Sequence, residues 1–288
     1  MKGEKTSHQK LTEPQSGADQ ANIKTRAVRD GDDWLITGEN VFISTFKDVN
    51  WLTGQAMTDP NAPRHRNTGL FIIENPAPGL LIKEMDLLVG KRQKQIYMDN
   101  VRVSGDHLIG GPQQGWQVMG TLLEAEHGGR GRAVPQDEEI DRLLEYVREV
   151  KRDGQSVGSD PVLAQKTVEA YLDSHLAMLL VKRTYSMYMN HQAMQYESNL
   201  ANVFGRLSGL RNAIRIREVV GLESLVSVKD PTARYDGLFE IRQRGAAGQR
   251  HAGGSTNIAK VILARRIGIS RTKERAAPTP STATKEGV

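Results

Sequence analysis

Apolar and polar residues alternate through most of the first third of the chain, a pattern that indicates β-strands. The alternation runs from Ile23 to Thr45 and is interrupted by the turn sequence Asp30-Gly31-Asp32-Asp33. Further strands are predicted at Trp51–Met57, Gly69–Ile73, Leu80–Met85 and Gln95–Val103. Connections rich in proline and glycine separate them. About six short strands joined in this way predict a small antiparallel sheet or β-barrel-like domain.

The spacing of apolar residues becomes helical after Gly110-Gly111-Pro112. A helix is predicted over Trp116–Glu126, and a second is predicted from the spacing of Ile140, Leu143, Leu144, Val147 and Val150. Asp160 before Pro161 combines a capping residue with proline at the first helical position, so a third helix is expected to begin there.

The third predicted helix carries an apolar stripe of four residues, Val168, Leu172, Leu176 and Leu179. Two more helices are predicted, at Tyr196–Val220 and Thr256–Ile267. Long helices with short links are typical of an antiparallel bundle. The predicted fold class is therefore α+β, a small antiparallel β-barrel-like domain followed by an antiparallel helical bundle.

These patterns divide the chain into four segments. We expect a disordered leader at residues 1–10, a β-domain at 11–113, a helical bundle at 114–270 and a disordered tail at 271–288. The last segment is rich in threonine, alanine, proline and charged residues, a composition that buries too little apolar surface to fold.

Composition then narrows the classes of function. The chain has no apolar run of about 18 residues, so no membrane-spanning helix is predicted, and no apolar core follows Met1-Lys2-Gly3-Glu4-Lys5 to make a signal peptide. The absence of cysteine excludes disulfides and cysteine-ligated metals, and fits a cytoplasmic protein. The net charge of +5 comes from scattered basic residues, which favours a solvated surface over a nucleic-acid site.

Three common chemical motifs are missing or lack their context. Gly154-Gln155-Ser156-Val157-Gly158 matches the Gly-x-Ser-x-Gly nucleophile elbow, but the residues before it have a helical period where the elbow needs a strand, so an interhelical loop is favoured. The seven histidines form no His-x-x-x-His pair, and no metal site is predicted. No Walker or Gly-x-Gly-x-x-Gly sequence occurs, so a classical nucleotide-binding fold is not expected.

A distinctive segment runs from Leu11 to Asp19, with the sequence Leu-Thr-Glu-Pro-Gln-Ser-Gly-Ala-Asp. Proline fixes one φ angle, and Gly17 allows a conformation or a close approach that a Cβ would block. Such a bend can turn backbone N–H groups and short side chains toward a planar or phosphorylated ligand, although alone it also fits an ordinary turn.

This segment resembles the Leu-Thr-Glu-Pro-x-x-Gly-Ser-Asp signature that opens the middle β-domain of the acyl-CoA dehydrogenase family. Gly38–Ser44 is similar to that family's Gly-x-Lys-x-Trp-Ile-Thr pattern. Gly253–Ile258 and Ile262–Gly268 resemble its Gly-Gly-Thr-Ser-Glu-Ile and Ile-Ala-Arg-Arg-x-Leu-Gly ending. Three motifs in the family's order make the resemblance specific.

The resemblance implies that FAD is bound between the β-domain and the helical bundle. Leu11, Thr12 and Gly17 carry over directly as cofactor-binding residues. The serine that follows in the family is Ala18 here, so a side-chain contact to a phosphate is expected to be lost.

Other cofactor contacts are carried over with substitutions. Phe42 takes the place of a tryptophan beside the flavin ring, and Ser44 that of a threonine whose hydroxyl meets flavin N5. Ser255 and Asn257 replace residues that contact the cofactor from the C-terminal motif. Without the resemblance, Phe42 and Ser44 would be read as ordinary strand residues.

The implied reaction removes hydrogens from Cα and Cβ of an acyl-CoA thioester. It needs a carboxylate base, donors that stabilise the thioester oxygen and a flavin as hydride acceptor. One family position for the base is Gly253 here. The other lies in a Leu-x-x-Glu-Arg pattern, which Leu123-Glu124-Ala125-Glu126-His127 matches with histidine for arginine, so Glu126 is the catalytic candidate. On its own it would be read as an exposed helix glutamate.

The expected function is that of an FAD-dependent acyl-CoA dehydrogenase of lipid metabolism, such as fatty acid β-oxidation, which forms a 2-enoyl-CoA. The resemblance implies electron transfer to an electron-transfer flavoprotein and assembly into a homo- or hetero-oligomer. The connection Thr58–Arg66 also resembles a subset of the family, some of whose members act on sterol side chains and often form mixed oligomers.

Family members carry a helical domain ahead of the first motif, whereas ten residues precede it here. We therefore expect a fragment, a split gene or a second subunit that completes the fold. The alternative function is that of a non-catalytic subunit of a hetero-oligomeric dehydrogenase. A basic protein of this fold that binds DNA is a third hypothesis.

Overall fold

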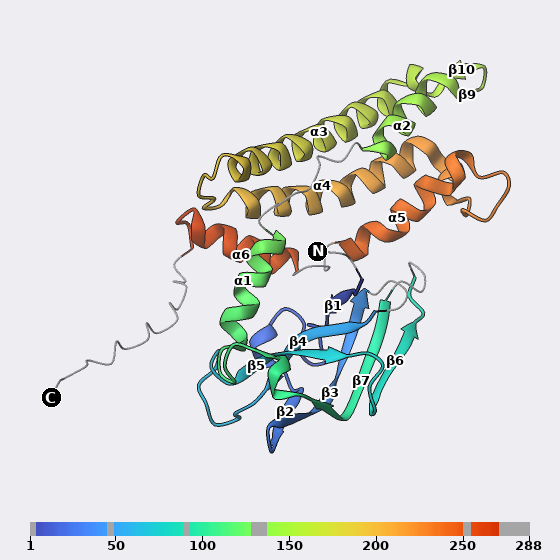
Figure 1. Ribbon diagram of the computed structural model, residues 1–288. Helices are drawn as coiled ribbons and strands as arrows, with labels where there is room; N and C mark the ends of the chain where they lie inside the picture. Colours follow the sequence, from blue (N-terminus) through green and yellow to red (C-terminus); the bar gives the residue numbers. More distant parts are fainter. Residues whose placement is uncertain (1–3, 45–48, 89–92, 128–136, 250–254, 271–288) are drawn as a thin grey trace.

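The computed structural model describes residues 4–44, 49–88, 93–127, 137–249 and 255–270. A sheet domain comes first in the chain, and α1 (Gly115–His127) leads from it toward a layer of long helices (Figure 1). The predicted tail lies outside the described residues. The two parts correspond to the two periodicities of the sequence, alternation first and helical spacing afterwards.

The sheet has eight strands: β1 (Ser7–Gln9), β2 (Arg26–Asp30), β3 (Asp33–Ser44), β4 (Trp51–Met57), β5 (Thr68–Glu74), β6 (Leu80–Met85), β7 (Gln93–Val103) and β8 (Leu108–Ile109). The order is β6-β7-β3-β2-β4-β5-β8, with β1 also paired to β4. The described strands therefore form an open order with two ends, and the predicted barrel-like closure is not seen.

The sheet is also not purely antiparallel, which corrects the prediction. β1 and β2 both run parallel to β4, β1 beside residues 51–53 and β2 beside Met57. The reason is that β1 and β2 follow the same edge of β4 in the same direction, one after the other. Between them, the chain leaves that edge and returns. Residues 7–9, which the sequence pattern assigns to a disordered leader, thus belong to the sheet.

Apolar residues at alternate positions along the strands fill the core of the sheet domain. Ile36, Leu52, Phe71, Ile73, Ile96 and Val101 are fully buried there. The ring of Trp34 meets the ring of Phe71 edge to face, with 5.6 Å between the centroids. Burial of this kind supplies most of the free energy that stabilises a sheet of short strands.

The helical part contains α2 (Glu138–Glu149), α3 (Pro161–Met189), α4 (Glu197–Val220), α5 (Leu238–Gln249) and α6 (Thr256–Arg266). α3 and α4 lie side by side (Figure 1). α3 begins as predicted, because the Asp160 carboxylate accepts hydrogen bonds from the N–H groups of Val162 and Leu163. No sequence pattern predicted α5.

Ser156, the serine of the Gly-x-Ser-x-Gly match, lies in a short β-hairpin. It does not lie at a tight turn from a strand into an α-helix, as a nucleophile elbow requires. β9 (Lys151–Arg152) pairs with β10 (Gln155–Ser156) between α2 and α3. The Arg152 guanidinium donates to the carbonyl oxygens of Val219 and Val220 at 2.9 and 2.8 Å. The hairpin therefore caps the C-terminal end of α4, a structural role.

The apolar stripe of α3 lies on its outer side. Its four members, Val168, Leu172, Leu176 and Leu179, are each about half exposed. The residues of α3 that are buried are small or polar, among them Thr167 and Ala170. They allow α4 to approach, and the Asn212 side-chain amide donates to the Ala170 carbonyl at 3.0 Å. The helical period predicted the helix correctly but did not identify the face that is buried.

The core of the sheet domain can be tested with a matched pair on the β2–β3 hairpin. Ile36 is fully buried, whereas Val28 is 61% exposed. We expect Ile36→Ala to lower the free energy of unfolding by about 2–5 kcal/mol, because it leaves a cavity. Val28→Ala should change it by less than about 0.5 kcal/mol. Urea unfolding of both variants checks this, and equal losses would contradict the described core.

Candidate functional site

The Leu11–Asp19 segment lies in a loop that is anchored at both ends to β4. The N–H of Lys10 donates to the carbonyl of Thr53, and the N–H of Met57 donates to the carbonyl of Thr25, both at 2.8 Å. The residues between Lys10 and Thr25 leave the edge of the sheet and come back to it. This fixes the start and the end of the segment that the sequence singled out.

A buried carboxylate closes the loop. Glu13 is 3% exposed, and its two oxygens accept hydrogen bonds from the backbone N–H groups of Lys24 and Thr25 at 2.5 and 2.9 Å. Backbone hydrogen bonds also join Glu13 and Ser16 in both directions. Charge-assisted hydrogen bonds of this kind are strong, and this carboxylate is engaged by the loop itself.

The loop is joined to β3 through Thr12. The carbonyl of Thr12 accepts from the Val41 N–H at 2.9 Å and from the Asn40 side-chain amide at 3.2 Å. The Lys10 ammonium in turn donates to Asn40 Oδ1 at 3.3 Å. Burial lowers the pKa of Lys10 to about 8, and the charge of Glu13 opposes that shift. The structure therefore brings the first and second sequence motifs together.

Phe42 stands at a bulge where β3 pairs with β7. The register shifts between Asn40 and Ile43, and Phe42 has a φ of 58° with its side chain 52% exposed. A positive φ is strained for an aromatic residue, and bulges of this kind re-aim side chains near functional sites. The Phe42 N–H reaches the sulfur of Met85 at 3.4 Å.

The other sheet-side candidates lie close to this bulge along the chain or on the loop. Ser44 ends β3 with its side chain exposed, and its carbonyl is 2.7 Å from His8 Nδ1. Leu11 and Thr12 are partly buried, and Gly17 is exposed with nothing within 4 Å of the place a Cβ would take. The loop and the end of β3 therefore carry an exposed aromatic ring, the hydroxyl groups of Thr12 and Ser44 and the open space beside Gly17.

The helical candidates lie on α6, a separate element. Ser255 caps this helix, because its hydroxyl accepts from the Ile258 N–H at 3.3 Å, and Asn257 is exposed in the first turn. In Figure 1, α6 lies between α4 and the sheet. That these two residues and the sheet-side set, Thr12 and Phe42, form one site stays a prediction, and Gly253 lies outside the described residues.

Glu126 belongs to the last turn of α1. Its side chain, like those of Glu124 and His127, lies outside the described part of the structure. Its role as the base stays a prediction.

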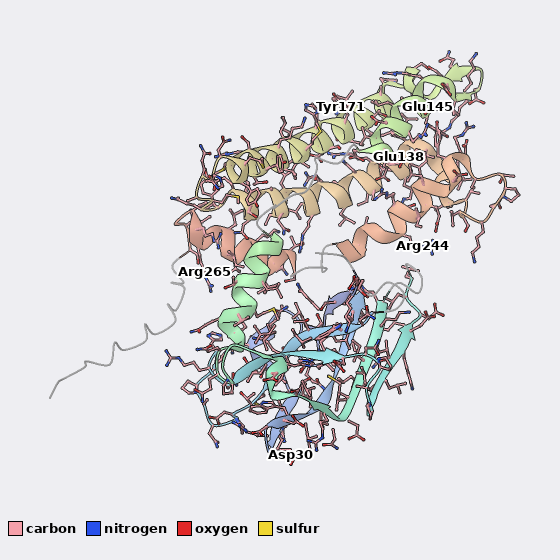
Figure 2. All side chains as sticks on the ribbon, in the orientation of Figure 1. Asp30, Glu138, Glu145, Tyr171, Arg244 and Arg265 are labelled. Atoms are coloured by element: carbon pink, nitrogen blue, oxygen red, sulfur yellow. The ribbon has the colours of Figure 1, made fainter. Side chains whose placement is uncertain are left out.

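Sequence patterns missed a contact that links the two parts of the molecule. Arg244 lies on the side of α5 that faces the sheet domain (Figure 2). It donates to the carbonyl of Leu88, in the connection after β6, at 2.9 Å and to the Glu240 carboxylate at 3.0 Å. Because α5 itself was not predicted, this anchor could not have been found from the sequence.

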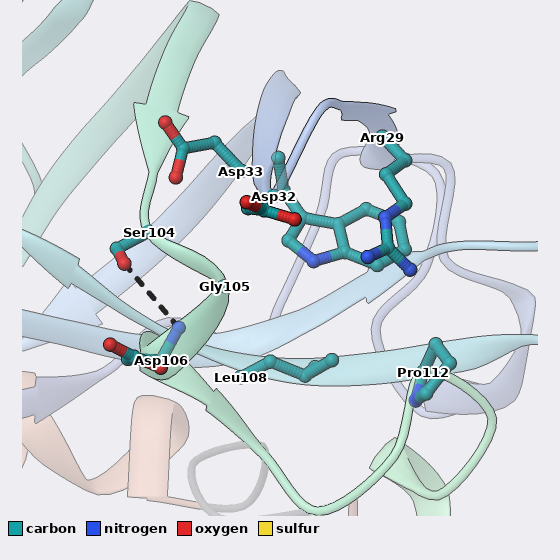
Figure 3. Close-up of a pocket in the computed structure, with 9 residues that line it drawn as sticks. Arg29, Asp32, Asp33, Ser104, Gly105, Asp106, Leu108 and Pro112 are labelled. Atoms are coloured by element: carbon teal, nitrogen blue, oxygen red, sulfur yellow. Dashed lines mark hydrogen bonds between the residues drawn. The ribbon is translucent and has the colours of Figure 1, made fainter.

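A hollow of about 480 Å³ lies beside the β2–β3 turn (Figure 3). That turn is at the end of the sheet domain away from the helices (Figure 1). The lining is polar and includes Arg29, Asp32, Asp33 and Asp106, and none of the predicted site residues. Among the residues that the structure describes, no group of three histidine or carboxylate side chains could hold a metal ion.

The fold defines a class of protein in which a sheet domain, with the first motif bonded to the strand of the second, is followed by a helical domain. The family model for the acyl-CoA dehydrogenase middle domain matches residues 9–101, and that for the acyl-CoA dehydrogenase C-terminal domain matches residues 113–268. The chain belongs to the acyl-CoA dehydrogenase family.

Individual relatives agree with this assignment. Acyl-CoA dehydrogenase FadE34 of Mycobacterium tuberculosis is 30% identical over 185 residues, which is 63% of this chain and 26% of that protein. The solved Tcur3481-Tcur3483 steroid ACAD matches with a TM-score of 0.84 at 22% identity, over 93% of this chain and 69% of that one. The ChsE4-ChsE5 complex from Mycobacterium tuberculosis matches with a TM-score of 0.81 at 21% identity, over 93% and 70%. These two structures support the fold.

The chain spans about a quarter to somewhat under half of the length of the curated relatives it matches. No helix in the described ranges combines the length and the apolar character that crossing a bilayer requires.

The helical domain also buries a carboxyl group that sequence analysis did not single out. Burial raises the pKa of Glu139, in the first turn of α2, to about 7; the charge of Asp137 adds to the shift and that of Arg242 opposes it. One of its oxygens, Oε1, is buried and has no hydrogen-bond partner. The native state therefore holds a proton here that the unfolded chain releases near its ordinary pKa of 4.5.

This difference predicts the sign of a pH effect on stability. Because the folded pKa is raised, stability contributed by the neutral form is lost as the pH rises from about 4.5 to about 7. Glu139→Gln should remove that loss. The free energy of unfolding of the variant, relative to that of the parent, should therefore rise by on the order of 2 kcal/mol from about pH 5 to about pH 8. Urea unfolding at both pH values measures it. Glu138→Gln, at an exposed neighbour, is the control, and parallel pH curves for Glu139→Gln and the parent would refute the assignment.

Proposed function

We propose that this chain is the FAD-binding part of an acyl-CoA dehydrogenase that oxidises an acyl-CoA thioester to its 2-enoyl form. The observation that carries the proposal is the junction of the two motifs, where Thr12 of the loop bonds to β3 next to the exposed, left-handed Phe42. The matches to both the middle and the C-terminal family domains support it.

The residues present fit the cofactor. Phe42 offers an exposed ring, Ser44 and Thr12 offer hydroxyls, and there is open space beside Gly17. Leu11 completes the set on the sheet side. On the helical side, Ser255 and Asn257 would contribute from the first turn of α6. FAD, when bound, supplies the acceptor for the hydride that leaves Cβ of the substrate.

The chain's own residues then have two tasks. The loop and the β3 bulge orient the cofactor, and Glu126 takes the proton from Cα. A base for this proton needs a pKa that its surroundings adjust toward that of the carbon acid. Electrons would leave to an electron-transfer flavoprotein, and the chain would act within an oligomer, as in the structurally similar ChsE4-ChsE5 complex. The steroid ACAD among the matching structures makes a steroid acyl-CoA the substrate class to test beside fatty acyl-CoA.

Binding of flavin is the first test. The purified chain should bind FAD, measured by quenching of FAD fluorescence, and anaerobic acyl-CoA should bleach the bound flavin. A folded chain that leaves FAD fluorescence unchanged would refute the proposal.

The role of Glu126 is tested by bleaching rates. Glu126→Gln should bind FAD as the parent does and bleach about 10²- to 10⁴-fold more slowly, because a general base is lost. Glu124→Gln, two residues away on the same helix, is the matched control and should keep the parent's rate. Equal rates for Glu126→Gln and the parent would exclude Glu126 as the base.

A further inference from the structure

A buried lysine stands beside the second motif, at a position that the motif does not include. The pattern Gly-x-Lys-x-Trp-Ile-Thr has lysine at its third place, where this chain has Asn40. The chain has a lysine at position 10 instead, and its ammonium lies 3.3 Å from Asn40 Oδ1. Both Lys10 and Asn40 are 1% exposed. The ammonium group of a residue that directly follows β1 thus lies next to the side chain that replaces lysine in the pattern.

The packing around Lys10 makes room for its stem. A Cβ on Gly54, in β4, would lie 2.6 Å from Lys10 Cγ and 2.3 Å from the Lys10 carbonyl oxygen. Real Cβ atoms do not approach so closely, so only glycine fits at position 54. The lysine therefore occupies a space that the neighbouring strand leaves open, and its burial is part of the fold.

The ammonium acts on the loop through Asn40. A buried ammonium is costly unless it is paired, and the partners here are the Asn40 side-chain oxygen and the charge of Glu13. The Lys10 bond fixes Asn40 Oδ1 as the acceptor, which leaves the amide nitrogen to donate to the Thr12 carbonyl at 3.2 Å. The order of contacts is Lys10, Asn40, Thr12.

We propose that Lys10 is a positioning residue which supplies, from the strand edge before the loop, the ammonium that the family pattern supplies from position 40. Through Asn40 it holds Thr12 and the loop in the place from which they meet FAD. Only this last step rests on the proposed function.

The test is a double-mutant cycle in the full chain with Lys10→Ala, Asn40→Lys and the two combined. Each variant is measured for thermal unfolding without FAD and for FAD affinity by fluorescence quenching. Lys10→Ala leaves the buried Asn40 Oδ1 without its donor, and Asn40→Lys puts two ammonium groups together, so each single change should lower the melting temperature by about 4 °C or more. Each should also weaken FAD binding by about tenfold.

The combined variant moves the ammonium to position 40, where it replaces the Asn40 amide as donor to the Thr12 carbonyl, and it should recover most of both losses. Lys10→Met keeps the stem without the charge, so it should show the same two losses, and it takes the place of Lys10→Ala if the larger truncation unfolds the chain. Lys24→Met removes an exposed lysine of the same loop and should change neither value. If the combined variant loses as much melting temperature as the two single variants together, or more, then an ammonium at position 40 cannot replace the one at position 10, and the proposal is overturned.

The two readouts separate the possible failures. If the parent chain does not bind FAD, the proposed function fails, while the melting temperatures still decide whether position 40 can replace position 10. If stability recovers in the combined variant but FAD affinity does not, the exchange stands and the positioning of the loop toward FAD is overturned.

Discussion

The loop after β1 is closed by the buried Glu13 carboxylate, which accepts hydrogen bonds from two backbone N–H groups. Leaving a buried charge without such partners would cost several kcal/mol, so the segment has one low-energy way to leave β4 and return to it. With both ends of the loop fixed, Thr12 is held against β3. The geometry of the candidate site follows from this closure.

The position of the helical layer relative to the sheet domain depends on contacts made far from the motifs. α1 leads out of the sheet domain, and Arg244 of α5 ties the helical layer back to the connection that follows β6. α4, against which α6 packs, is in turn held by Arg152 at its C-terminal end. Elements distant in sequence therefore hold the helical layer together and tie it to the sheet domain, and local signals at the motifs do not contain that information.

The sequence predicted the elements that depend on periodicity and capping. The bounds of β4 and β6 coincide with the predicted strands, and α3 begins after Asp160 as its capping chemistry requires. β1 was missed because it consists of three polar residues, none of them buried, and so shows no alternation of apolar and polar positions. α5 was missed because two glycines interrupt its pattern. Periodicity also could not tell which side of α3 is buried, since Thr167 and Ala170 are buried while the residues of the apolar stripe are about half exposed.

For the site, the motifs located the loop and the strand end but not the features that make them functional candidates. Nothing in the letters around position 42 predicts a left-handed aromatic residue. Such a conformation costs about 1–3 kcal/mol and persists only where its surroundings determine it. Here β3 pairs with β7 on both sides of the bulge, and the Val41 N–H bonds to Thr12. The fold thus keeps the Phe42 side chain exposed, on a backbone with a strained positive φ, directly beside the closed loop. Packing of the core does not require this conformation. Because this strain is a feature of the structure and not of the motif, it gives a physical reason, separate from the sequence resemblance, to test the end of β3 as part of a functional site.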